Sequence, residues 1–268
     1  MRFDPYPLLR RGARRAGFHL VRANYYSPIP DVDALPPRTF EEPRPMPGVD
    51  LRIEASLLHL EEVLGPLIEA WQPSRWQPAN PMYGSLDGEV LYAMVRHLAP
   101  LHVLEIGGGW SSLCIADAAP ERHDIVDPFP AAVLDGFDVW RVGATEIPEA
   151  RFDELRAGDI LFIDTTHTVK PGSDVNYLLL EVLPRLASGV VVHVHDFFRP
   201  FEYPRPLFEE YGVYWQEHYL LQALLVGGAF EVLMANHALA RLHHERVRAI
   251  VPSLTEEAMP SALWMRKV

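Results

Sequence analysis

From residue 85 onward, short apolar segments alternate with helical patterns along the chain. The apolar segments have the length of strands rather than of buried helices, and they lie at residues 101–106, 123–126, 137–142, 160–163, 189–194, 230–235 and 262–265. Continuous apolar strands separated by helices indicate an α/β fold with a mostly parallel sheet covered on both faces. We expect the last strand to be the antiparallel member. Because such sheets bind ligands at the carboxyl ends of their strands, functional residues should follow each strand directly.

The first 80 residues have a different character. Seven prolines lie between Pro28 and Pro47, and proline both lacks an amide hydrogen and restricts the residue before it, so this stretch should be extended. A short basic helix within residues 5–22 and an amphipathic helix over residues 49–71 are expected on either side of it. We therefore divide the chain into an N-terminal helical and Pro-rich extension, residues 1–80, and a domain formed by residues 81–268.

Charge and cysteine content exclude several classes of protein. The 268 residues carry a formal net charge of -12, which disfavours nucleic-acid binding by the chain as a whole. Six arginines in the first 22 residues are the local exception; they indicate either a solvated helix face or a contact for an anionic substrate or membrane surface. Cys114 is the single cysteine, so internal disulfides and multi-cysteine zinc sites are excluded. Without an apolar run of membrane-spanning length, the chain is expected to be a cytoplasmic protein.

A glycine-rich loop follows the first predicted strand. Residues 104–109 read LEIGGG, and Ser111 and Ser112 open the next helix. Glycines such as Gly107 and Gly109 let a backbone turn tightly and approach a ligand closely. The phosphate-loop pattern is absent, and the dinucleotide pattern is incomplete because Ser112 stands where its third glycine belongs.

Two acids beside this loop indicate which cofactor it would bind. Glu105 would repel a pyrophosphate, but it would form a charge-assisted hydrogen bond with an ammonium group. Asp127 ends the second predicted strand and is placed to accept hydrogen bonds from ribose hydroxyls. S-adenosylmethionine (SAM) carries both an ammonium group and a ribose. The alternative interpretation is that both acids only cap turns at strand ends.

These motifs resemble those of class I SAM-dependent methyltransferases. Residues 104–109 look like the first motif of that family, Asp127 matches its second-strand acid, and residues 158–167 resemble its fourth strand and the following loop. Residues 25–30, 82–85, 170–174, 193–196 and 201–204 are similar to one bacterial group of small-molecule and sugar O-methyltransferases. The resemblance implies a Rossmann-like fold that binds SAM through Tyr83, Glu105, Gly107, Gly109, Ser111, Asp127 and Asp164.

Two further strand ends carry groups that could perform chemistry. Asp164 and His167 follow the fourth predicted strand, and His195 and Asp196 follow the fifth. Carboxylates and imidazoles can bind a divalent cation or supply a general base. Related sugar and natural-product O-methyltransferases have two consecutive acids after the fifth strand, and here the first of them is His195. We predict a Mg²⁺ or Mn²⁺ site at Asp164, His195 and Asp196, with His167 and Asp164 as catalytic residues; the alternative is a set of hydrogen-bonded strand-end residues.

The sequence thus predicts an enzyme that transfers the methyl group of SAM to a hydroxyl of a small molecule, a sugar or a natural product. Two other classes stay open: an NAD- or nucleotide-sugar-binding Rossmann enzyme, and a non-catalytic SAM-binding interaction protein. The expected partner is a hydroxylated acceptor, with no nucleic acid and no membrane span, and a homo-oligomer is left open.

Overall fold

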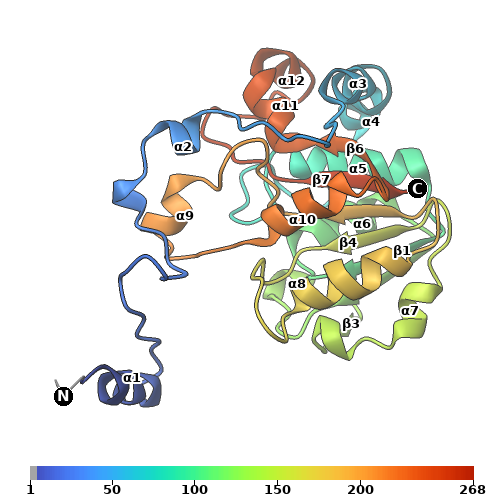
Figure 1. Cartoon of the computed structure of the whole chain (residues 1–268). Coiled ribbons are helices and arrows are strands. Elements are labelled where there is room, and N and C mark those ends of the chain that lie inside the picture. The colour runs from blue at the N-terminus through green and yellow to red at the C-terminus, as the bar shows by residue number, and fades with distance from the viewer. Residues whose placement is uncertain (1–4) are drawn as a thin grey trace.

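The computed structural model describes residues 5–268, and its centre is one seven-stranded sheet (Figure 1). The strands are β1 (His102–Ile106), β2 (Arg122–Val126), β3 (Val139–Trp140), β4 (Ile160–Ile163), β5 (Val191–Val194), β6 (Phe230–Ala235) and β7 (Leu263–Lys267). They lie in the order β3-β2-β1-β4-β5-β7-β6. Strands β1 to β5 are parallel to one another, whereas β7 is antiparallel to both β5 and β6. The predicted α/β fold, with its mostly parallel sheet and antiparallel C-terminal strand, is confirmed.

Helices cover both faces of the sheet. They are α1 (Tyr6–Arg15), α2 (Arg38–Glu41), α3 (Ile53–His59), α4 (Gly65–Ala70), α5 (Asp87–Leu98), α6 (Trp110–Ala118), α7 (Glu149–Asp153), α8 (Asp174–Tyr177), α9 (Arg205–Glu209), α10 (Glu217–Val226), α11 (Asn236–Leu242) and α12 (His244–Ile250). Helices α5 and α6 pack on one face together with α3, α4, α11 and α12, and α7, α8 and α10 lie on the other (Figure 1). None of the helices within residues 5–268 is both long and apolar enough to cross a bilayer.

Two helical segments are interrupted for the same reason. The amphipathic helix predicted over residues 49–71 forms α3 and α4 with a π turn at Leu60–Leu64 between them, and the next residues include Pro66. In the same way, α8 continues into a π turn at Leu178–Val182 just before Pro184. Proline lacks an amide hydrogen and its ring displaces the carbonyl one turn earlier, so the backbone widens locally instead of ending the helix.

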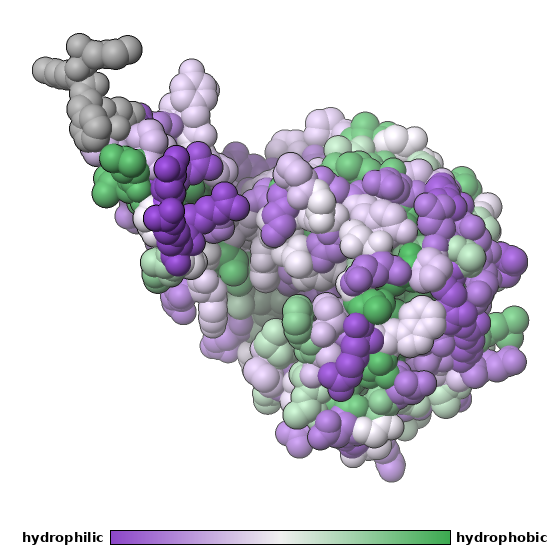
Figure 2. Space-filling view, turned by 90° about the horizontal axis from the view of Figure 1, so that it is seen from below, coloured by the Kyte–Doolittle hydropathy of each residue, from purple (hydrophilic) through white to green (hydrophobic). Residues whose placement is uncertain are grey.

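The extension consists of two unlike parts. Within the described residues, no side chain before Leu51 is buried. Leu57, Leu60 and Leu64, in contrast, are fully buried in the same apolar cluster as residues of α5 and β1. The part nearest the N-terminus, residues 5–31, is called the arm here; it carries α1 and projects away from the sheet (Figures 1 and 2). Residues 32–50 then run along the body, where the Arg44 amide donates to the Pro200 carbonyl. The boundary predicted between residues 80 and 81 stays a prediction, although the core includes residues on both sides of it.

Candidate active site

The loop after β1 passes directly against the end of β4. Gly107 has φ +88°, and a Cβ added there would lie 1.6 Å from the backbone oxygen of Asp164. Only glycine fits that position, because both the left-handed backbone and the close approach exclude a side chain. Gly109, by contrast, faces open space, with no atom within 4 Å of its ideal Cβ position. The loop therefore brings Asp164 beside β1 and leaves the backbone around Gly109 accessible.

Glu105 is fully buried beneath this loop. Its carboxylate accepts hydrogen bonds from the hydroxyls of Ser111 and Ser112, at 2.6 and 2.7 Å, and lies 2.8 Å from Nε2 of His123. Both carboxylate oxygens are therefore occupied, and they tie the start of α6 to β2. The prediction that Glu105 and Ser111 bind the cofactor is not tested by this geometry, which gives both residues a role in holding the loop.

Asp127 follows β2 and is half-buried beside the glycine loop. Its Oδ1 accepts a hydrogen bond of 2.6 Å from the amide of Phe129. Burial raises the pKa of the Asp127 carboxyl above its ordinary value, and Glu105 and Asp164 add to that effect, whereas the amides of Phe129 and Gly108 oppose it. An acid next to two other acids is stabilised by hydrogen-bond donors, and ribose hydroxyls are donors of that kind.

Tyr83 does not lie at the wall of the cavity described below. Its side chain is buried, and its hydroxyl lies 3.3 Å from Nε2 of His193. Burial lowers the pKa of His193, so this imidazole is neutral and can accept the hydrogen bond. The predicted contact between Tyr83 and a cofactor stays a prediction. Its neighbours Gly84 and Ser85 do line the cavity.

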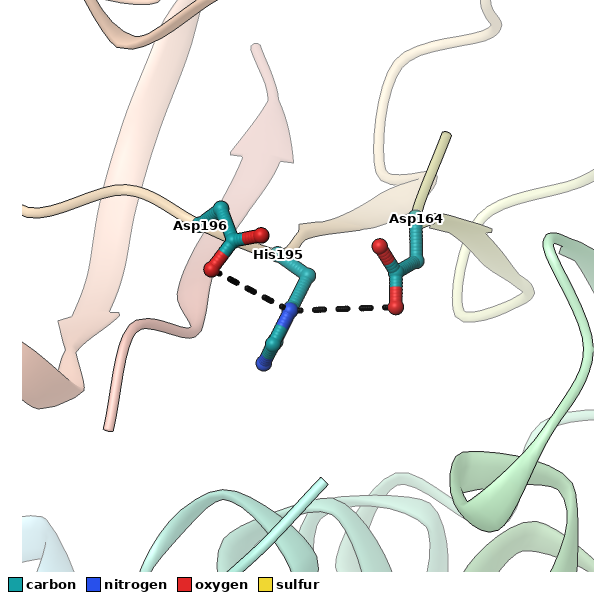
Figure 3. A group of neighbouring side chains, drawn as sticks. All are labelled: Asp164, His195 and Asp196. Carbon is teal, nitrogen blue, oxygen red and sulfur yellow. Dashed lines mark ion pairs between the residues drawn. The ribbon is translucent and has the colours of Figure 1, made fainter. Parts of the chain in front are cut away.

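Three of the predicted residues meet at the ends of β4 and β5. Asp164, His195 and Asp196 each offer a ligand atom, and these atoms all lie within 4.8 Å of one another. Figure 3 shows Nδ1 of His195 between the two carboxylates, 3.7 Å from Asp164 and 3.6 Å from Asp196. Although burial opposes it, His195 and His167 hold the pKa of the Asp196 carboxyl well below its usual range. The structure thus brings together the residues that were predicted as metal ligands.

The surroundings of His195 suit a metal ligand. Its Nε2 lies 3.3 Å from the buried carboxylate of Asp87, so this second nitrogen has its own partner while Nδ1 faces the two aspartates. Ligating imidazoles commonly have a carboxylate at their other nitrogen, because it orients the ring and fixes its tautomer. In a coordination shell with bonds of about 2.1 Å, neighbouring ligand atoms lie roughly 3.0–3.4 Å apart, so Asp164, His195 and Asp196 need only a small inward shift. Although burial opposes it, Asp196 and Asp164 raise the pKa of His195 well above its ordinary value, so the imidazole would release its proton when a divalent cation takes its place between the two carboxylates.

His167 is clamped by three carboxylates. Its Nδ1 lies 2.8 Å from Glu217, and its Nε2 lies 3.2 Å from both Asp164 and Asp196. Burial lowers the pKa of His167, but Asp196, Asp164 and Glu217 outweigh it and raise the pKa well above the ordinary value. The imidazole is thus cationic with both nitrogens engaged. A cationic imidazole with both nitrogens engaged does not suit a general base, so the predicted catalytic residue His167 is better placed to hold Asp164 and Asp196.

The backbone around this cluster is strained. Leu86, His167 and Asp196 have positive φ angles of 69°, 54° and 60°, a region that side chains other than glycine rarely adopt. Each such conformation costs about 1–3 kcal/mol, and it persists where the surroundings impose it, commonly at functional sites.

Sequence reasoning missed two acids of the cluster, Asp87 and Glu217. Each stands at the first position of a helix, and neither follows a strand. The next residue after Glu217, His218, is fully buried, and its ring stacks on that of Tyr203 with 3.6 Å between the centroids. The sequence feature that could have identified both residues is an acid at the first position of a helix, where the helix start packs near the carboxyl ends of the strands.

A cavity of about 900 Å³ opens above the cluster. Asp164, His167, His195 and Asp196 form its floor, and residues 78–85, 207–215 and 253–261 supply most of its walls. The lining does not include Glu105, Gly109 or Asp127, whereas Asp164 both lines the cavity and lies against Gly107 of the loop. Asp164 therefore separates two neighbouring regions, the glycine loop and the cavity.

Comparison with known proteins identifies the central part of the chain. Residues 104–197 match a family model described as a methyltransferase domain. A curated, uncharacterized protein of Archaeoglobus fulgidus is 26% identical over 143 residues, which are 45% of this chain and 63% of that protein. The chain thus aligns with less than two thirds of the length of this relative.

Two solved structures are similar to the chain at low identity. The SAH-bound methyltransferase PaMTH1 of Podospora anserina is 15% identical, over 80% of this chain and 88% of that one, with a TM-score of 0.38. The plantazolicin methyltransferase BpumL, solved with a pentazolic desmethylPZN analog and SAH, is 11% identical, over 81% of this chain and 96% of that one, with a TM-score of 0.39. The family match thus covers the glycine loop and strands β2 to β5, and this part of the chain is similar to a methyltransferase domain.

Proposed function

We propose that this protein transfers the methyl group of SAM to a hydroxyl oxygen of a small molecule, a sugar or a natural product, with a divalent cation at the reacting hydroxyl. The observation that carries the proposal is the position of Asp164. It touches the glycine loop on one side and lines the cavity on the other, so a cofactor and an acceptor can meet beside it.

On the cofactor side, the accessible backbone at Gly109 and the carboxylate of Asp127 suit the methionine and ribose parts of SAM. Glu105 holds the loop through Ser111 and Ser112. In the reaction, the bond between the sulfonium and the methyl carbon breaks while a bond from the acceptor oxygen to that carbon forms. S-Adenosylhomocysteine leaves as a neutral sulfide. Alignment of oxygen, carbon and sulfur supplies a large share of the acceleration, up to about 7–11 kcal/mol in the best intramolecular cases.

On the acceptor side, Asp164, His195 and Asp196 would hold the cation. A bound divalent cation lowers the pKa of a hydroxyl that it contacts. Asp164 is the most exposed side chain of the cluster, at 30%, and it is the carboxylate that can accept the hydroxyl proton and pass it to solvent. His167, fixed by Glu217, donates to Asp164 and Asp196 and positions them. Asp87 orients His195 in the same way.

The test begins with cofactor binding. Calorimetry should show that the protein binds SAM and that Asp127→Asn weakens this binding, whereas the exposed Asp138→Asn leaves it unchanged. Binding of NAD in place of SAM would favour the Rossmann-enzyme alternative. The second step supplies SAM labelled in its methyl group with a panel of hydroxylated acceptors. Label in the ether product supports the proposal, and SAM binding without transfer to any acceptor would favour a non-catalytic protein.

The cation has its own test. Chelation with EDTA should abolish transfer, and addition of Mg²⁺ or Mn²⁺ should restore it, while SAM affinity stays the same in both states. Full transfer after chelation would remove the cation from the proposal and leave methyl transfer intact.

A further inference from the structure

The lining of the cavity above Asp164 indicates what kind of acceptor it can bind, which the strand-end motifs do not. Its volume of about 900 Å³ lies at the upper end of the range for small-molecule sites. Its polar groups gather at the floor, where Asp87, Asp164 and Asp196 face the two imidazoles. Ser85, Ser253 and Ser261 also line it. An acceptor hydroxyl is therefore expected to point toward the floor.

The walls, in contrast, are mainly apolar. Large apolar or aromatic side chains come from four separate segments of the chain: Met82, Phe198, Leu207, Tyr211, Trp215 and Met259. Several of them remain accessible, with 74% of Met82, 67% of Tyr211 and 48% of Met259 exposed. Exposed apolar residues that gather around a cavity indicate the surface on which a ligand is buried. These walls suit a ring system or another apolar body.

Lysine and arginine are absent from the lining of the cavity, all of whose residues lie within the described part of the chain. The nearby Arg199 is buried, with Nε donating to Gln222 at 2.8 Å, and Arg205 pairs with Glu209 and Asp33. The imidazoles at the floor are already paired with carboxylates, as their distances to Asp164, Asp196 and Glu217 show.

Acidic residues flank the cavity at two places in the sequence. Glu210 precedes Tyr211, and Glu256 and Glu257 lie just before Met259; all three glutamates are exposed. A phosphate or carboxylate held against these walls would lose its water without meeting a lysine or arginine, and the imidazoles at the floor are already neutralised by Asp164, Asp196 and Glu217. The cavity therefore selects against anionic molecules.

We propose that the acceptor is an uncharged molecule with a large apolar body that presents a hydroxyl to the cavity floor, and not a nucleotide sugar, a sugar phosphate or another anionic metabolite. This inference rests on the proposed function for the identity of the reaction, but the selection by charge and polarity follows from the cavity walls alone. It narrows the acceptor from any hydroxylated small molecule to the neutral, apolar part of that class.

The experiment compares the affinities of the full-length protein for three probes. Naphthol is neutral and apolar, hydroxynaphthoate has the same ring system with a carboxylate, and UDP-glucose represents nucleotide sugars. Titrations at neutral pH, followed by saturation-transfer NMR or probe fluorescence, contain neither SAM nor an added cation. Naphthol should bind at least about ten-fold more tightly than either anionic probe, because an anion pays an uncompensated desolvation cost. Absent naphthol binding, or equal or tighter binding of an anionic probe, would overturn the inference.

Two lysine variants test whether the preference for neutral probes arises in the cavity. Met259→Lys adds a cation to the wall, and Leu180→Lys adds one to an exposed apolar residue outside the cavity. Met259→Lys should tighten hydroxynaphthoate binding about two- to five-fold, whereas Leu180→Lys should leave it unchanged. Equal effects of both variants would show that overall charge, and not the cavity, sets the preference. SAM calorimetry on the same preparation tests the proposed function separately, since the probe titrations involve no cofactor and no turnover.

Discussion

The two ends of the candidate active site are built differently. On the cofactor side, Glu105 is satisfied by Ser111, Ser112 and His123, all within 18 residues of it. On the acceptor side, Asp164 and Asp196 meet His167 and His195, and the acids behind these imidazoles are Asp87 and Glu217. The first region is formed by one short stretch of the chain, whereas the second is assembled from segments that lie far apart in the sequence.

The two regions also differ in their net charge. One buried acid with three donors is a closed unit, and it needs no ligand to be stable. Four acids around two imidazoles keep excess negative charge in a buried space, and such a set is stabilised when a cation or a proton joins it. We therefore expect the acceptor side to respond more strongly than the cofactor side to a change of one charge.

The largest effect is expected at Asp196. Asp196→Asn removes the charge that faces both His167 and His195, and breaking a buried charge pair from one side costs about 3–5 kcal/mol in the free energy of unfolding. Turnover by the folded protein should fall about 10²–10⁴-fold, because the carboxylate pair at the acceptor is lost. Denaturant unfolding measures the first quantity, and single-turnover transfer with saturating SAM measures the second.

Asp138→Asn serves as the control for this prediction, since that aspartate is exposed and lies outside the cavity. It should change neither the unfolding free energy nor turnover. An Asp196→Asn protein as stable and active as the Asp138→Asn protein would remove the contrast between the two regions.

A second effect concerns acid stability behind the cavity wall. His237 is buried beside Phe198 and Phe201, its Nδ1 lies 3.0 Å from the Pro260 carbonyl, and burial lowers its pKa to about 4. The unfolded chain binds the proton first, near pH 6.5, because the folded pKa is the lower one. This contribution is complete above about pH 6.5 and is lost as the pH falls toward 4, by roughly 3 kcal/mol.

Urea unfolding at a series of pH values checks the acid effect. His237→Asn keeps an amide donor near the Nδ1 position but does not titrate in this range, so its stability should depend less on pH between 6.5 and 4. Identical pH slopes for the two proteins would show that other groups cause the acid sensitivity.

The third effect is on the cofactor side. Glu105→Ala leaves the hydroxyls of Ser111 and Ser112 without their acceptor and frees the start of α6. Loss of a charge-assisted hydrogen bond within the loop is worth about 1.5–3 kcal/mol, and SAM affinity should fall by as much as roughly 10–150-fold where binding requires the ordered loop. Calorimetry provides the measurement, with Ser111→Ala as the milder partner variant. SAM affinity unchanged in Glu105→Ala would contradict the assignment of this loop to the cofactor.

The same contrast explains what could be predicted from the sequence. The strands were found because each is short and continuously apolar, and Asp164, His167, His195 and Asp196 were found because they follow strands β4 and β5. Their convergence follows from parallel strand ends meeting at one edge. Asp87 and Glu217 were missed because each opens a helix, and only packing brings those helix starts behind the imidazoles. The cationic state of His167 also depends on acids that are distant in sequence.

The smallest effect on stability is expected from the arm, residues 5–31, which extends the comparison to a region with no buried side chain. Deleting residues 1–31 should change the free energy of unfolding by less than about 0.5 kcal/mol, because no side chain of residues 5–31 is buried in the core.

Deleting residues 1–48 should lower the free energy of unfolding further, since it also removes the Phe40–Phe208 ring contact and the Arg44 to Pro200 hydrogen bond. Asp33 pairs with Arg205 of α9, and Leu207 of α9 lines the cavity, so deleting residues 1–48 should impair acceptor methylation more than SAM affinity. Denaturant unfolding, SAM calorimetry and methyl transfer on the three proteins separate these outcomes. A protein lacking residues 1–48 that keeps full stability and full transfer would show that the extension serves neither the fold nor the acceptor.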